Sequence, residues 1–329
     1  MRLLLAALLG ALALIACPAR ADDLRPGYLE WTERSPKQWE VTWKAPLLGG
    51  LATRSTPILP AGCSVAQARR QIVGPAVVER FRVRCAAPMA GRTLGLSGLE
   101  SGFTDALLRV APLGQPVQAA RLTPRQPQVT VMASSVASTV GRTYLTYLGL
   151  GFGHILFGFD HLLFVVALVL LIGGWQRLVA TVTAFTVAHS LTLAATTLGW
   201  VSVARKPVEI CIALSIVLVA REILRPPDTA PTLARRAPAL IAFAFGLLHG
   251  FGFAAALAEI GLPPGEIPLA LFAFNVGVEF GQLAIVVATL AVLVAIARFA
   301  DGVRRPATVA GAYAIGAVAT AWLIERTLA

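Results

Sequence analysis

Long apolar runs dominate the second half of the chain. Six of them follow residue 141, and short polar segments separate one run from the next. They cover about residues 144–173, 178–199, 207–225, 238–258, 268–297 and 306–325. Because a helix rises about 1.5 Å per residue, each run is long enough to cross a hydrocarbon core of about 30 Å. The pattern predicts a polytopic α-helical membrane bundle of six transmembrane helices over residues 144–329.

Residues 22–135 follow a different pattern. In residues 39–43 apolar side chains occupy every second position, and in residues 80–85 three apolar side chains alternate with three arginines. A period of two is typical of half-buried antiparallel strands. Similar short runs lie near residues 28–33, 93–98, 105–110 and 127–132, with Gly, Pro and Ser clusters between them. We expect a small all-β, sandwich-like domain here, followed by a linker at residues 136–143.

Composition indicates a membrane protein and argues against a nucleic-acid-binding one. The 329 residues are 57% hydrophobic and 14% charged, with a mean hydropathy of +0.73. Ordinary soluble domains do not have this balance. The formal net charge is +11, but the arginines are scattered or lie at the ends of apolar runs. We interpret them as topology signals.

The first 21 residues resemble a secretory signal peptide. A basic residue precedes an apolar run at residues 3–15, and residues 19–21 form a small-x-small cleavage site. Residues 14–17 also resemble a lipoprotein acylation site, but the proline that follows favours simple cleavage. The β domain would then be exported, and six crossings would return the C-terminus to the same side.

The charges that flank the apolar runs agree with this orientation. Eight arginines would lie at cytoplasmic ends and three basic residues outside, as the positive-inside rule requires. The cytoplasmic set is Arg177, Arg221, Arg225, Arg235, Arg236, Arg298, Arg304 and Arg305, and the outer set is Arg205, Lys206 and Arg326. We expect a multi-pass protein of the inner (plasma) membrane, with its N-terminal domain and C-terminus on the periplasmic side.

Two cysteines, Cys63 and Cys85, lie in the expected exported domain. An oxidising compartment would allow them to form a disulfide. The alternative is two small buried apolar side chains.

Ionisable side chains occur inside the apolar runs, where they are costly and are therefore functional candidates. With the expected topology they come from five helices and share the outer half of the bilayer. The candidate site consists of His154, Asp160, His161, His189, Glu209, His249, Asn275 and Glu279. Imidazole and carboxylate groups suit borderline divalent transition metals. Each residue alone could also be a structural hydrogen-bonding group, but their joint presence favours a metal site or a proton pathway.

Helical phase refines this site. His154 and His161 are seven residues apart, so they share one helix face two turns apart. Asp160 lies about a quarter turn away and is suited to orienting a neighbouring imidazole. Three glycines surround His249 and would let another backbone approach it closely.

Residues 154–161 read His-Ile-Leu-Phe-Gly-Phe-Asp-His. They resemble the signature His-Pro-x-x-Gly-x-Asp-His of the HupE/UreJ family of hydrogenase and urease accessory membrane proteins, with isoleucine where the family often has proline. The polar segments around His189, Glu209, His249 and residues 275–282 are similar to the branch of this family with an added exported domain. The resemblance covers roughly residues 143–325. It implies permeation of nickel or cobalt for cofactor supply.

We therefore interpret the chain as a membrane permease for a divalent transition metal ion, nickel or cobalt. In this hypothesis the residues of the first helix form the entry and the first ligands, and the histidines of the second and fourth helices complete the set. Glu209, Asn275 and Glu279 would supply oxygen ligands or exchange protons.

Two other interpretations use the same residues. The site could hold zinc in an intramembrane hydrolase that acts on a lipid amide or ester, with Ser190 as an auxiliary group. The protein could also be a non-transporting scaffold for metalloenzyme maturation proteins. The expected partners are the metal ion, the lipid bilayer and such maturation proteins, without nucleic acid.

Overall fold

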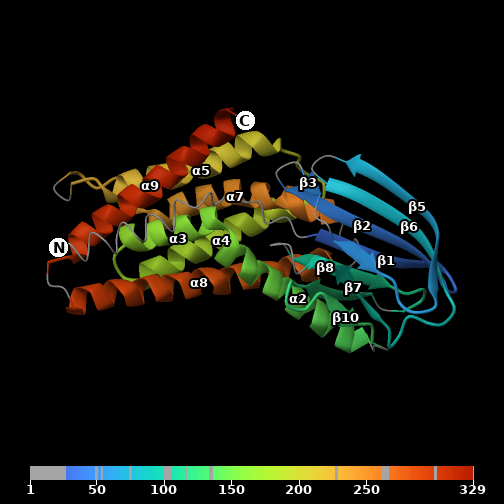
Figure 1. The fold of residues 1–329 in the computed structure, drawn as a ribbon. Helices are drawn as coiled ribbons and strands as arrows, with labels where there is room; N and C mark the ends of the chain where they lie inside the picture. Colours follow the sequence, from blue (N-terminus) through green and yellow to red (C-terminus); the bar gives the residue numbers. More distant parts are fainter. Residues whose placement is uncertain are drawn as a thin grey trace. The chain divides into compact units, whose positions relative to one another are not determined.

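The computed structural model describes ten segments of the chain. These are residues 27–48, 51–52, 55–73, 76–99, 105–115, 117–132, 136–226, 229–260, 267–299 and 302–328. The expected signal peptide lies outside them. The described residues form two compact units, one within residues 23–150 and 259–273 and the other within residues 151–258 and 274–329. Figure 1 shows a strand-rich part and a helical part.

Two β-sheets build the first unit (Figure 1). The larger sheet has the order β5-β6-β2-β1-β8-β9, with β3 paired to β2, and the smaller has the order β10-β7-β4. The larger sheet contains β1 (Gly27–Ser35), β2 (Gln38–Leu48), β3 (Leu51–Ala52), β5 (Cys63–Val73), β6 (Ala76–Cys85), β8 (Ala106–Ala111) and β9 (Gln118–Leu122). The smaller sheet contains β4 (Thr56–Ile58), β7 (Thr93–Ser97) and β10 (Gln128–Thr130). The expected β domain is therefore present.

The core of this unit follows the alternation in the sequence. Trp39, Val41 and Trp43 of β2 are buried, whereas the residues between them are only partly so. On β6, residues 80–85 alternate as predicted, and the strand pairs antiparallel with both β2 and β5. Side chains of β7 join the same core. The two sheets therefore enclose one hydrophobic core, as in a sandwich.

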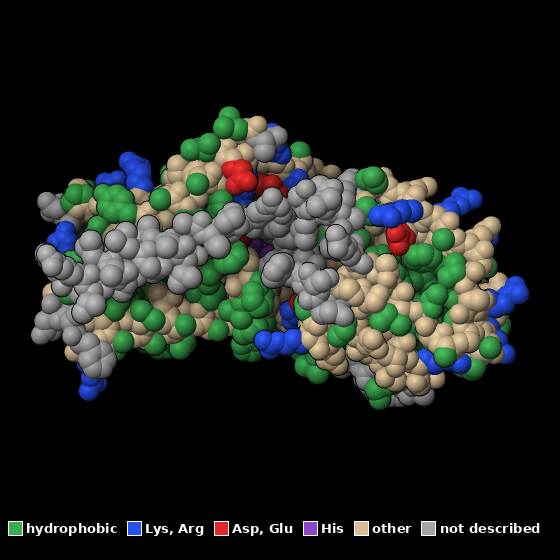
Figure 2. Space-filling view, viewed as in Figure 1, with side chains coloured by type: hydrophobic (Ala, Val, Ile, Leu, Met, Phe, Trp, Pro, Cys, Tyr) green, Lys and Arg blue, Asp and Glu red, His purple; other side chains and the backbone are tan. Residues whose placement is uncertain are grey.

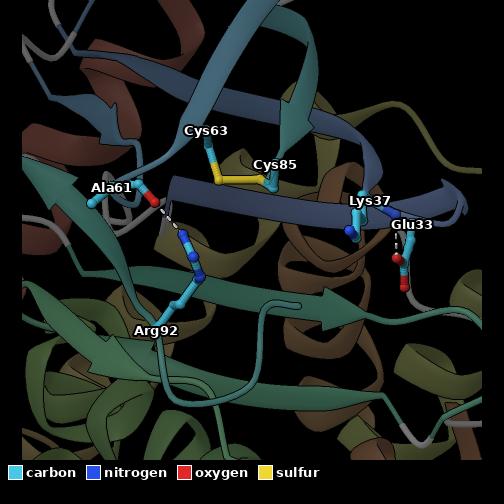
Figure 3. The surroundings of a disulfide bond; sticks show 6 residues. All are labelled: Glu33, Lys37, Ala61, Cys63, Cys85 and Arg92. Atoms are coloured by element: carbon cyan, nitrogen blue, oxygen red, sulfur yellow. Dashed lines mark hydrogen bonds between the residues drawn. A yellow bond between two sulfur atoms is a disulfide. The ribbon is translucent and has the colours of Figure 1, made fainter. Parts of the chain in front are cut away.

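A disulfide joins the ends of β5 and β6 (Figure 3). Cys63 and Cys85 lie directly opposite each other in the ladder, with Cα atoms 4.0 Å apart. Nearby, the guanidinium of Arg92 donates to the carbonyl of Ala61. Of the two alternatives for these cysteines, the structure has the disulfide.

Every apolar run predicted to cross the membrane is helical. The helices are α2 (Val136–Phe157), α3 (Phe159–Leu171), α4 (Trp175–Thr197), α5 (Arg205–Ile223), the short α6 (Leu233–Arg236), α7 (Pro238–Ile260), α8 (Ile267–Phe299) and α9 (Arg304–Leu328). The expected linker at residues 136–143 forms the start of α2. Large apolar side chains such as Leu191, Val287 and Val292 are exposed, and Figure 2 shows many apolar side chains on the molecular surface.

By length and composition alone, fewer helices than predicted can cross a membrane. Within the described residues, α4, α8 and α9 are long and apolar enough to cross a bilayer. A fourth span results if α2 and α3 count as one broken segment, and the described apolar part of α7 is shorter. Charged residues at both ends of α5, including Arg205 and Glu222, dilute its apolar character. The structure supports a membrane protein with three or four spans, and six spans remain a prediction.

The first apolar run is broken, where a single helix was expected. Gly158 separates α2 from α3, and the two helices meet at 70°. A Cβ atom on Gly158 would lie 2.5 Å from the carbonyl oxygen of His154, closer than such atoms approach. The absence of a side chain therefore permits this bend.

Glycines also allow the close approach predicted around His249. A Cβ on Gly246 would lie 2.4 Å from the carbonyl oxygen of Phe185, and one on Gly250 would lie 2.4 Å from that of His189. These contacts bring α7 against the backbone of α4. They place His249 beside Phe185 of α4, with ring centres 5.1 Å apart.

Candidate metal centre

The four histidines lie together inside the helical unit. His154 on α2, His161 on α3 and His189 on α4 each offer a ring nitrogen, and these atoms lie within 4.8 Å of one another. The ring of His249, on α7, is 4.8 Å from that of His161, centre to centre. Exposed fractions run from 0% to 7%. The four residues are referred to below as the histidine cluster.

The break at Gly158 creates the closest pair in this cluster. On a straight helix, seven residues would separate His154 and His161 by about 10 Å along the axis. The bend brings their ring centres to 4.6 Å. Both imidazoles can therefore face the same small volume.

Asp160 lies against the ring of His161. Its Oδ1 accepts a hydrogen bond from the backbone N–H of His161 at 2.8 Å and lies 3.0 Å from Nδ1 of the same residue. If Nδ1 carries the proton, it donates to this carboxylate and the lone pair is on Nε2. Carboxylates that hold metal-binding histidines in this way raise the basicity of the ligand.

Hydrogen-bonding groups also hold His189 and His249. Nδ1 of His189 lies 3.2 Å from Oδ1 of Asn275 on α8. Nε2 of His249 lies 3.3 Å from the hydroxyl of Ser215 on α5. Oδ1 of Asn275, which was expected to serve as an oxygen ligand, thus contacts the ring of His189.

Several ring nitrogens of the cluster suit a bound cation. In the part of the chain that the structure describes, Nε2 of His154, Nε2 of His189 and Nδ1 of His249 are buried without a hydrogen-bond partner. An unsatisfied buried polar atom costs about 1–3 kcal/mol, and coordination to a metal would offset that cost. The ligand nitrogens of His154, His161 and His189 lie within 4.8 Å of one another, and metal–nitrogen bonds of about 2.0–2.1 Å set ligand atoms closer together than this. A bound ion would therefore draw these three nitrogens toward one another.

Aromatic rings enclose the cluster. Phe185 lies 5.1 Å from His249 and 6.1 Å from His161 between ring centres, and Phe253 lies 4.2 Å from His154. These rings exclude water from the imidazoles. Coulombic interactions are stronger in such a low-dielectric environment.

The two glutamates of the predicted site have other partners. Glu209 forms an ion pair with Arg205, one turn away on α5. Glu279 accepts a 2.6 Å hydrogen bond from Thr183 of α4. Among the described residues, neither carboxylate forms a hydrogen bond or an ion pair with a histidine. The structure thus brings six of the eight predicted residues together, whereas the carboxylates of Glu209 and Glu279 pair with other residues.

A ladder of polar contacts joins α4 and α8 beside the cluster. After the contact of His189 with Asn275 comes a hydrogen bond of 2.9 Å from Thr186 to Gln282. The bond from Thr183 to Glu279 follows further along α4. Polar groups therefore continue from the histidines along one helix pair.

Sequence reasoning missed Arg326, which it counted as a topology charge. The side chain of Arg326 is 9% exposed, and its guanidinium lies 3.9 Å from Oδ2 of Asp160. It also donates a 2.7 Å hydrogen bond to the backbone carbonyl of Glu209. The sequence did contain one indication of this position: Trp322 lies four residues before Arg326, so both side chains are on the same helix face. The ring centre of Trp322 lies 5.9 Å from the guanidinium.

Comparison with known proteins identifies the chain at the family level. The model of the family described as HupE / UreJ protein matches residues 130–326, more than half of the chain. The matched segment contains the whole histidine cluster. No curated protein and no solved structure matches. The chain belongs to the HupE/UreJ family.

Proposed function

We propose that this protein is an inner-membrane permease for a divalent transition metal ion, nickel or cobalt. The observation that carries the proposal is the histidine cluster, in which four buried imidazoles from four helices meet. Neutral nitrogen ligands suit nickel, cobalt and zinc, whereas a copper(I) path would need sulfur ligands. The association of the HupE/UreJ family with nickel and cobalt uptake favours the first two.

In this proposal each residue of the site has a distinct role. His154, His161 and His189 bind the ion, and His249 completes the set. Asp160 orients His161 and partly balances the charge of the ion. The six apolar runs cross the membrane, with the β unit and the C-terminus outside, and the disulfide fits an oxidising compartment.

The α4–α8 ladder supports transport rather than a closed site. A carrier needs polar groups beyond its binding site, because an ion that leaves its ligands must be solvated again. Thr186, Gln282, Thr183 and Glu279 supply such groups. We propose that they line the route by which the ion leaves the cluster.

Uptake of radioactive nickel and cobalt by cells tests this function. We expect His161→Ala to lower uptake by about tenfold or more, because groups that only support a ligand are already worth 10–100-fold. Ser190→Ala is the matched control, since its hydroxyl bonds the carbonyl of Thr186 within α4. Equal uptake by wild type and His161→Ala, above cells with an empty vector, would contradict the role of the cluster.

One observation favours a second function, intramembrane hydrolysis. The hydroxyl of Ser215 lies beside Nε2 of His249, so a metal-activated water at the cluster would have a polar neighbour. Ser190, the auxiliary expected from the sequence, points to a backbone carbonyl instead. Release of fatty acid from a lipid amide or ester by purified protein, with no metal uptake by cells, would establish this function.

A further inference from the structure

Arg326 places a positive charge at the edge of the histidine cluster, where a carrier of cations would be expected to avoid one. Its side chain is 9% exposed, and that of Asp160 is 1% exposed. Two opposite charges this deep attract each other strongly, because little water screens them. The pair therefore affects the binding of an ion at the histidine cluster.

The two oxygens of Asp160 face different partners. Oδ1 is occupied by the backbone and ring of His161. Oδ2 is buried and has no hydrogen-bond partner among the described residues. The guanidinium of Arg326 stands 3.9 Å from it, too far for a hydrogen bond and close enough for an ion pair. Arg326 thus neutralises Asp160 without fixing it.

Other contacts anchor the arginine. Its guanidinium donates to the carbonyl of Glu209 at 2.7 Å and lies over the ring of Trp322. These contacts hold the charge on α9 near the cluster whether or not Asp160 pairs with it. A dication at the histidines and this guanidinium would repel each other and would attract the same carboxylate.

We propose that Arg326 is an internal competitor of the transported ion. It balances Asp160 when the cluster is empty, and it opposes the ion when the cluster is filled. Arg326 thereby lowers the affinity of the cluster for the ion and accelerates the release of the ion. A carrier requires this release, because a tightly held ion cannot leave. The inference rests on the proposed permease function and adds a positioning residue, Arg326, that acts both by repelling the ion and through its pairing with Asp160.

Metal binding and transport by the full-length protein test this inference together. Nickel affinity is measured by titration of purified protein, and nickel uptake is measured in cells. We expect Arg326→Gln to bind nickel about tenfold more tightly than wild type, because one repelling charge is removed. Its maximal uptake rate should fall, while Arg326→Lys, which keeps the charge, should restore both values toward wild type.

A purely structural arginine would behave differently. Its loss would weaken binding, and the maximal rate would follow the amount of folded protein. Arg235→Gln is the matched control, because it removes a positive charge from the helical unit beside another carboxylate, that of Glu222. Unchanged or weaker nickel binding by Arg326→Gln would overturn the inference, and so would equal tightening by Arg235→Gln.

A second comparison covers the case in which Arg326→Gln does not fold. Asp160→Asn and the double variant Asp160→Asn/Arg326→Gln differ only in the arginine, and the double variant leaves neither charge of the pair buried alone. We expect the double variant to bind nickel more tightly than the single one, and equal or weaker binding would overturn the inference. Failure of wild type to bind or take up nickel or cobalt would overturn the proposed function and this inference with it. If wild type takes up the ion but the variants have the same nickel affinity as their references, this inference is overturned and the proposed function is not.

Discussion

The histidines of the cluster are held by different neighbours. His161 rests against the carboxylate of Asp160, and His189 rests against the amide oxygen of Asn275. A hydrogen bond to one ring nitrogen selects the tautomer and aims the other nitrogen at the ligand. An amide carries no charge, so Asn275 orients its histidine without adding to the attraction for a cation.

Removal of this amide should weaken metal binding. We expect Asn275→Ala to lower nickel affinity by about tenfold, the lower end of the effect of groups that support a ligand. Titration of the purified protein measures it. Gln282→Ala is the control, because Gln282 lies on the same helix and accepts its bond from Thr186. Equal loss of affinity in both variants would show that α8 acts only as a scaffold.

At the scale of elements, the broken first span decides the geometry of the site. A straight helix would keep His154 and His161 two turns apart, and the bend at Gly158 brings the rings together. Asp160 occupies the first turn of α3, where a negative charge interacts favourably with the helix dipole. The break therefore positions two ligands and the carboxylate that orients one of them.

Substitution of this glycine should disturb the helical unit and the cluster together. A Cβ on Gly158 would lie 2.5 Å from a backbone oxygen, so we expect Gly158→Ala to destabilise the unit by about 1–3 kcal/mol. Thermal unfolding in detergent measures this change, and nickel titration measures the loss of affinity. Gly173→Ala is the control, because a Cβ there meets nothing within 4 Å. A melting temperature and affinity equal to wild type would show that the bend tolerates a side chain.

At the scale of the whole molecule, the described residues form two compact units. The β unit has its own core between two sheets and its own disulfide. The helical unit holds all four histidines. Stability of the first unit and metal binding by the second should therefore respond to different substitutions.

Loss of the disulfide should separate these two properties. The bridge closes a loop between residues 22 apart, and we expect Cys63→Ser/Cys85→Ser to destabilise the β unit by about 2–4 kcal/mol. Limited proteolysis of the full-length protein would detect earlier cleavage within the β unit, whereas nickel affinity should stay within about twofold of wild type. Cys211→Ser is the control, because this cysteine is free. A parallel loss of nickel binding would contradict the independence of the two units.

Much of the architecture was predictable because it follows from local periodicity. Alternation along residues 39–43 and 80–85 identified two strands and the side chains that they bury. Apolar runs identified every long helix, although charges at the ends of α5 show that a helical run need not meet the criteria for a membrane span. The family resemblance was confirmed by the match over residues 130–326.

By itself, the sequence determined which segments are helices or strands and which polar side chains lie in apolar surroundings. Only the tertiary structure decided which of those side chains meet. It broke the first span at Gly158, paired Glu209 with Arg205 and brought Arg326 to Asp160. The physical reason is that periodicity reports the face of a helix on which a residue lies. The distance between two helices depends on bends and on backbone contacts between residues far apart in the chain.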